Sequence, residues 1–178
     1  MTLITTAGSS SATSIASLAD AESYMATIQT GYKSAWISAA DTNKESALVQ
    51  ASRLLYSLPW IGSRANQTQT MCWPRIASRA GYGFGYGSFG WLQDADGYPI
   101  DSTTIPDQIV QACCEFAFRL LSEDRTADAG GLIRFGGSLG PIKDAYRIER
   151  RPIPASVLDM VSPLLTSDPR NGGLMVRS

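Results

Sequence analysis

The chain has 178 residues, of which 15 are basic and 16 acidic, so its formal charge is −1. A chain of this length can fold as one domain with its own core, and the absence of a basic excess argues against strong duplex binding through bulk electrostatics. It contains no histidine, which excludes histidine-based catalytic triads and histidine-ligated metal sites.

Two helices are predicted in the first third of the chain. Residues 1–17 are small and polar and are expected to form an extended arm or loop. Ser17 and Asp20 then form a capping box at the start of a helix that ends near Gly31. The second helix covers residues 41–58. Asp41 or Thr42 is expected to cap it, with Glu45 completing the cap, and Pro59 stops it.

Two further helices are predicted downstream. The third begins at residues 104–107, where Thr104 is the expected cap, Ile105 the hydrophobic staple and Pro106 the first helical residue. Its apolar residues recur with helical spacing from Ile109 to Leu120. The last helix covers residues 157–165, and its end is expected to be distorted by a proline at position 163.

Short apolar pieces separated by glycines follow residue 130 and predict a β-hairpin over residues 131–149. The predicted fold is therefore mainly α, a small helical bundle of about four helices with a short β-hairpin and a long glycine- and aromatic-rich loop. We expect one domain over residues 1–166, interrupted by an inserted loop at 79–98, and a flexible tail over residues 167–178.

One segment fits no regular element. Residues 79–91 read RAGYGFGYGSFGW, with five glycines and five aromatic residues. Exposed aromatic rings favour contact with a partner that covers them. We therefore assign these rings to a hypothetical interface: Tyr82, Phe84, Tyr86, Phe89 and Trp91.

The same segment leaves a second interpretation open. Aromatic rings between glycines, with Arg75 and Arg79 nearby, are what a stacking platform for single-stranded DNA would use. Against this interpretation stands the shortage of local cations, because backbone binding requires a positive groove.

Charge is distributed unevenly along the chain. Residues 1–124 hold 7 basic and 11 acidic side chains, whereas residues 125–178 hold 8 basic and 5 acidic ones. Ordinary solvated faces would explain this pattern. A polarised subunit whose basic end meets the acidic end of another copy would also explain it. Under the second interpretation, three basic residues join the hypothetical interface: Arg150, Arg151 and Arg170.

Catalytic, cofactor-binding and metal-binding motifs are not found. The chain lacks a Gly-x-Ser-x-Gly elbow and a phosphate-binding loop, and the aspartates around Gly97 lack the glutamate of a calcium loop. Cys113 and Cys114 are adjacent on a predicted helix, so they are poor disulfide partners. A cysteine-dependent enzyme would require a reactive Cys72 with a cationic or imidazole partner. We expect no enzyme activity and no cofactor.

No apolar run approaches the roughly 18–20 residues that cross a bilayer. The odd number of cysteines, together with a start that lacks the basic residues of a secretory signal, indicates a soluble protein in a reducing, cytoplasm-like compartment.

Several short motifs occur in a recognisable order along nearly the whole chain. They are Ser17-Leu18-Ala19-Asp20-Ala21 with Tyr24, Trp36, KESALVQA at 44–51, Trp60-Ile61-Gly62, Gln69 with Trp73-Pro74-Arg75, Asp96-Gly97 with Ile105-Pro106, Ala112 with Glu115-Phe116-Ala117, and Pro154 with Leu164-Leu165. The chain thereby resembles the head–tail adaptor (connector) proteins of tailed bacteriophages, whose sequences are often labelled DnaT-like single-stranded-DNA-binding. It departs from them in the segment 79–91, which looks like an insertion after Arg75.

The resemblance implies a mostly helical subunit that forms a ring of about twelve copies beneath the portal of a DNA-filled head. Its partners would be other copies of itself, the portal protein and the next neck or tail component, with DNA only as passing cargo and no membrane contact. The protein would be made in the host bacterial cytoplasm and end in the neck of the virion. We assign Trp73, Pro74 and Arg75 to structure, together with Trp60, Gly62, Ile105 and Pro106.

Overall fold

The computed structural model describes residues 3–28, 33–77, 92–94, 96–123 and 153–167. Its elements are α1 (Leu18–Thr27), α2 (Lys33–Ser38), α3 (Asp41–Tyr56), β1 (Ser63–Arg64), β2 (Arg75–Ile76), α4 (Asp107–Ser122), α5 (Ala155–Val161) and the 3-10 turn η1 (Ser162–Leu164). The predicted small, mainly α fold is confirmed. Helix α2 has no counterpart among the predicted helices, because its six residues are too few to show a helical repeat.

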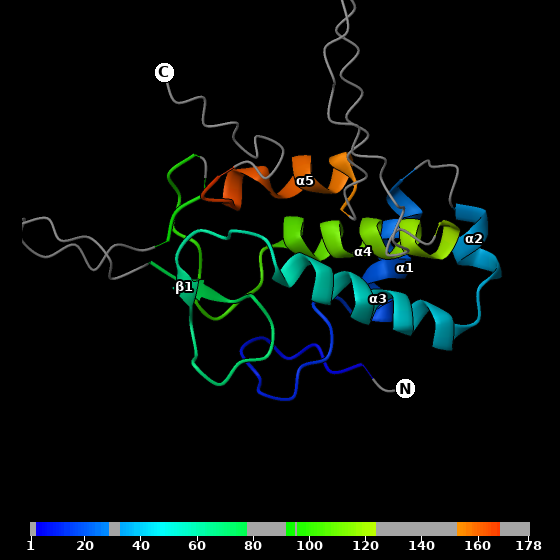
Figure 1. Ribbon diagram of the computed structural model, residues 1–178, viewed down its shortest axis with the longest axis horizontal. Helices are drawn as coiled ribbons and strands as arrows, with labels where there is room; N and C mark the ends of the chain where they lie inside the picture. The colour runs from blue at the N-terminus through cyan, green and yellow to red at the C-terminus, as the bar shows by residue number, and fades with distance from the viewer. Residues whose placement is uncertain (1–2, 29–32, 78–91, 95, 124–152, 168–178) are drawn as a thin grey trace, which may run out of the picture.

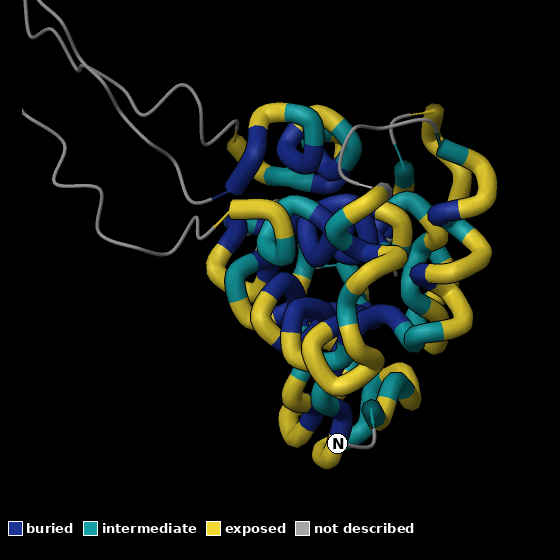
Figure 2. The backbone as a smooth tube through the Cα atoms, turned by 90° about the vertical axis from the view of Figure 1, so that its right-hand side faces the viewer, coloured by how far each residue is buried: buried dark blue, intermediate teal, exposed yellow. Residues whose placement is uncertain are grey.

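Helix α4 forms the centre of the molecule. It lies between α5 and α3, with α1 and α2 also against it (Figure 1). Residues around most of its circumference are buried: Ile109, Ala112, Cys113, Cys114, Glu115, Phe116, Ala117 and Phe118. A helix with so wide a buried surface must be covered on several sides, which explains why four helices pack onto it. Figure 2 shows the buried residues gathered along this central layer.

A cluster of aromatic and charged side chains joins the first four helices. The ring of Trp36 on α2 lies edge-on to Phe118 of α4, with 4.5 Å between the ring centroids. Its Nε1 donates to Glu22 of α1 at 3.2 Å, and Lys44 of α3 donates to the same carboxylate at 3.0 Å. Trp36 and Phe118 are fully buried, so this cluster anchors the short helix α2 to the core.

The capping predictions succeed at one helix and fail at two. At α1, Ser17 and Asp20 form the expected capping box. At α3 the N-cap is Ala40, whose methyl group cannot accept a hydrogen bond, and the Asp41 carboxylate lies 3.5 Å from Lys44 Nζ instead. At α4 the N-cap is Pro106 itself, so Thr104 lies too early to cap the helix. The expected proline distortion near residue 163 is present as η1.

The N-terminal arm is part of the folded domain. Ser14, Ile15 and Ala16 are buried, and the backbone N–H of Ile15 donates to Ser52 Oγ on α3 at 2.9 Å. The Thr70 hydroxyl donates to the Ala12 carbonyl at 2.6 Å. Residues 3–17 form no helix or strand, which agrees with the predicted arm or loop, and Ile15 and Ala16 pack into the core.

The strand pair of the described chain lies in an unexpected place. Strands β1 and β2 pair antiparallel, with Ser63 opposite Ile76 and Arg64 opposite Arg75. Two-residue strands are too short to show an alternating pattern in the sequence. The predicted hairpin at 131–149 and the aromatic segment 79–91 lie outside the described residues. Within the described ranges, no helix is both long and apolar enough to span a membrane.

Candidate functional site

Arg75 closes the loop that connects α3 to the second strand. Its Nε donates to the Ile61 carbonyl at 2.6 Å, its Nη2 to the Gly62 carbonyl at 2.6 Å and its Nη1 to the Cys72 carbonyl at 3.1 Å. Burial lowers the pKa of Arg75 from its ordinary value, yet an arginine stays charged at neutral pH. One half-buried guanidinium therefore holds both ends of this loop through charge-assisted hydrogen bonds.

Gln69 organises the same loop from within. Its side chain is almost fully buried: Oε1 accepts from the backbone N–H of Asn66 at 2.8 Å, and Nε2 donates to the carbonyls of Met71 at 2.9 Å and Pro74 at 3.0 Å. A buried amide with three partners is well satisfied and fixes the path of the backbone around it. Gln69 and Arg75 thus bind the Gln-x-x-x-Trp-Pro-Arg motif to the loop around it through hydrogen bonds.

Two tryptophans seat this unit on the helices. The rings of Trp60 and Trp73 meet edge to face, with 5.8 Å between the ring centroids. Trp60 Nε1 donates to the Leu55 carbonyl at the end of α3. Trp73 is fully buried, and the peptide bond between Trp73 and Pro74 is cis. Gly62 has a φ of +68°, and a Cβ there would collide with the Ile76 carbonyl oxygen. Ile105 packs against the core just before α4.

The residues assigned to an interface from the sequence cannot be placed in the same way. All eight lie outside the described residues: Tyr82, Phe84, Tyr86, Phe89, Trp91, Arg150, Arg151 and Arg170. Their assignment therefore remains a prediction. The described structure offers a different candidate surface.

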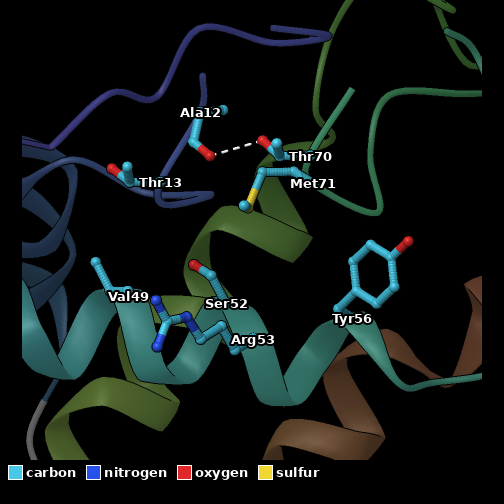
Figure 3. Close-up of a pocket in the computed structure, with 8 residues that line it drawn as sticks. All are labelled: Ala12, Thr13, Val49, Ser52, Arg53, Tyr56, Thr70 and Met71. Atoms are coloured by element: carbon cyan, nitrogen blue, oxygen red, sulfur yellow. Dashed lines mark hydrogen bonds between the residues drawn. The ribbon is translucent and has the colours of Figure 1, made fainter. Parts of the chain in front are cut away.

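A groove of about 420 Å³ lies between α3, the N-terminal arm and the loop before Cys72. Figure 3 shows its lining, with the α3 residues on one side and the arm and loop residues opposite. We call it the Arg53 groove. It is lined by Ala12, Thr13, Val49, Ser52, Arg53, Tyr56, Thr70 and Met71.

Arg53 differs from the other cations whose side chains the structure describes. Lys44 is paired with Glu22 and Asp41, Arg119 with Glu115, and the remaining two arginines donate to backbone carbonyls. Arg53 is exposed on α3, and within the described part of the chain its guanidinium has no hydrogen bond or ion pair. Its charge is available to a partner.

Tyr56 lies one turn further along α3, with 45% of its surface exposed. A free guanidinium, an aromatic ring and walls of Val49 and Met71 suit a ligand that is partly apolar and carries a negative charge. The groove contains no activated nucleophile, because the Ser52 hydroxyl is buried and already donates to the Leu48 carbonyl.

The three cysteines are all free and buried. Burial raises the pKa of Cys72 to about 12 and that of Cys113 to about 11, and it also raises the pKa of Cys114. At neutral pH these groups are thiols, which are poor nucleophiles. Among the described residues, no cluster of cysteine and carboxylate side chains has the composition of a metal site.

Sequence reasoning did not single out Arg53 or Tyr56. They lie three residues apart on the helix predicted over 41–58, off its apolar stripe. Such positions look like ordinary solvated surface until the arm and the loop are folded beside them. A tyrosine outside the apolar stripe of the predicted helix is the signal that the sequence offers at this position.

Comparison with known proteins gives one match. The model of the family described as "Putative DnaT-like ssDNA binding protein" matches residues 1–88 and 91–178. No curated protein and no solved structure matches the chain. The match confirms the DnaT-like part of the expected resemblance and carries no information on heads, portals or tails.

Proposed function

The chain belongs to the family described as "Putative DnaT-like ssDNA binding protein", and we propose that it is a structural, non-enzymatic protein of a tailed virus particle. In this role it is a head–tail adaptor: a ring of copies that docks under the portal, extends the DNA channel and offers an attachment surface to the next neck or tail component. It would be made in the host bacterial cytoplasm and end in the virion neck.

The observation that carries this proposal is the charge of the described chain. The described residues include 6 basic and 11 acidic ones. Of the basic side chains whose contacts are described, all except Arg53 are bound to carboxylates or backbone carbonyls. A protein that follows a nucleic-acid strand needs a row of free cations, which this part of the chain does not offer.

The acidic charge of the described residues suits a channel subunit better. Carboxylates repel phosphate groups, so they favour the passage of DNA over its retention. The remaining segments of the chain hold 9 basic and 5 acidic residues. Opposite charges on different parts of one chain support head-to-tail contacts between copies, the contact type that closes a ring.

The proposal is tested by removing the chain from an infected cell and examining the particles. Without it, we expect DNA-filled heads and separate tails to accumulate, and a supplied copy of the gene to restore joined particles. Normal tailed particles in its absence would contradict the proposal.

Binding of single-stranded DNA is a second candidate, favoured by the description of the family. The rings of residues 79–91 and the tyrosine beside Arg53 support it, since bases stack on such rings. A fluorescence titration with oligonucleotides at roughly 150 mM salt decides the matter, because a true binder keeps measurable affinity there. Micromolar or tighter binding would favour this candidate over the adaptor.

A further inference from the structure

A second exposed feature of the described chain is a turn that follows the aromatic segment. We call residues 92–94 and 96–101 the Tyr98 turn. The side chain of Tyr98 is 69% exposed, and Asp96 beside it is exposed as well. The turn carries two further aspartates, Asp94 and Asp101, so its tip combines one aromatic ring with an acidic surround.

The turn is held by hydrogen bonds of its own although it is exposed. Asp94 Oδ1 accepts from the backbone N–H groups of Asp96 at 3.0 Å and Tyr98 at 2.8 Å, and the Asp94 N–H donates to the Tyr98 carbonyl. Gly97 provides the positive φ of +86° that the turn requires. A large apolar ring on a fixed turn loses little conformational freedom when it is buried by a partner.

The Tyr98 turn and the Arg53 groove are complementary. The groove offers apolar walls with a free cation at the edge, and the turn offers a ring with a free carboxylate next to it. A groove of about 420 Å³ accepts a single aromatic side chain together with its neighbours. Because the rest of the described surface is predominantly acidic, an acidic turn finds its best partner at Arg53.

The two features lie on different parts of the molecule. In Figure 1 the green segment that includes the turn lies beyond the strand pair, above it in the view, whereas the blue N-terminal arm lies below α3. Two complementary surfaces at separate places form a two-fold dimer only where both contacts can close at once between the same two copies. They can pair from one copy to the next, which generates a ring or a filament.

We propose that the Tyr98 turn of one copy inserts into the Arg53 groove of the next copy. In this contact the Tyr98 ring packs against Tyr56 and Met71, and the Asp96 carboxylate pairs with the Arg53 guanidinium. The inference rests on the proposed function, since it names the contact that joins neighbouring subunits of the adaptor ring.

Charge exchange tests the pairing. Arg53→Glu and Asp96→Arg should each reduce self-association of the full chain on the order of tenfold, measured by light scattering over a concentration series, because each places like charges in contact. The double variant should recover most of the loss. Tyr98→Ser removes the ring from the turn and should also reduce self-association. Its control is Ile37→Ser: Ile37 is 70% exposed on α2, away from both features, and its replacement should leave self-association unchanged.

Engineered cysteines test the geometry. The native cysteines are buried, so background cross-linking is low. A chain carrying Arg53→Cys and Asp96→Cys should form a ladder of covalent oligomers on a non-reducing gel. A mixture of the two single variants should give dimers and no larger species. Replacing Asp96→Cys with Ile37→Cys should abolish the ladder.

Three results would overturn the contact. They are a double variant no better than its parents, cross-links formed only within one chain, and an Arg53→Glu variant that loses oligonucleotide binding while self-association stays unchanged. If any of these occurs while the tagged chain is still found in particles, the contact is wrong and the adaptor function stands. If the tagged chain is absent from particles, the proposed adaptor function is wrong. The ladder then shows only that the chain associates with itself.

Discussion

Arg53 and Arg75 carry the same side chain and do opposite things. The guanidinium of Arg75 donates to three carbonyls of its own loop, whereas Arg53 has no described partner and lines a groove. The first belongs to a motif that the sequence marks by its spacing, and the second belongs to a helix face that looks unremarkable. The marked arginine holds the fold together, and the unmarked one is available for contact.

This difference separates two kinds of evidence. A motif such as Gln-x-x-x-Trp-Pro-Arg attracts attention as a binding site, but here the side-chain polar atoms of Gln69 and Arg75 are bound by the chain itself. Among the described residues, the buried Nε1 of Trp73 has no hydrogen-bond partner. A side chain can bind a partner only with hydrogen-bonding capacity that the fold leaves unused. The comparison predicts that substitutions in the loop held by Arg75 lower the stability of the fold. Substitutions of Arg53 or Tyr56 in the groove should leave stability unchanged and lower self-association.

The largest effect is expected at Trp73. Trp73→Ala removes a fully buried ring and its edge-to-face contact with Trp60, so the free energy of unfolding should fall by about 3–5 kcal/mol. Tyr56→Ala is the control in the groove and should change the free energy of unfolding by less than about 1 kcal/mol. Urea denaturation measures both. Equal losses would erase the distinction between loop and groove.

The two arginines give the direct comparison. Arg75→Met leaves three carbonyls without their donor and should cost about 2–4 kcal/mol of stability. Arg53→Met should stay within about 0.5 kcal/mol of the unaltered chain. Thermal unfolding at neutral pH measures the two values side by side. A destabilising Arg53→Met would mean that the fold uses this cation after all.

Two glycines sharpen the comparison at the backbone. Gly62→Ala should cost about 2–3 kcal/mol, because its positive φ is combined with a clash against the Ile76 carbonyl. Gly97→Ala has the same sign of φ but open space around it, so about 1 kcal/mol is expected. The difference should appear in the urea midpoints. A smaller cost at Gly62 would show that β2 can move away from the loop.

Lys44 is an intermediate case, because its partners are carboxylates. Hydrogen bonding to Glu22 raises the pKa of Lys44 above its ordinary value of 10.5. A raised pKa in the folded state gives stability that is complete below pH 10.5 and is lost as the pH rises through the folded value. The unaltered chain should therefore lose more stability than Lys44→Met does as the pH rises above 10.5. If the free energies of unfolding of the two chains change in parallel over this pH range, the ion pair of Lys44 makes no such contribution to stability.

The sequence predicts the helices that carry a long apolar repeat, and the structure confirms them around α4. It does not predict α2, which is held by the Trp36 ring against Phe118, a contact between residues far apart in the chain. Nor does it predict the packing of the N-terminal arm, whose small polar residues give no periodic pattern and are held by Ser52 and Thr70. The Arg53 groove exists only because that arm folds against α3, so no local pattern could reveal it.

The assignment of this chain to the neck of a virus particle is tested most directly by locating it there. A tagged copy should be found in purified tailed particles by electron microscopy, with label confined to the junction between head and tail. Particles without label, from cells in which the tagged chain is made and folded, would contradict the account.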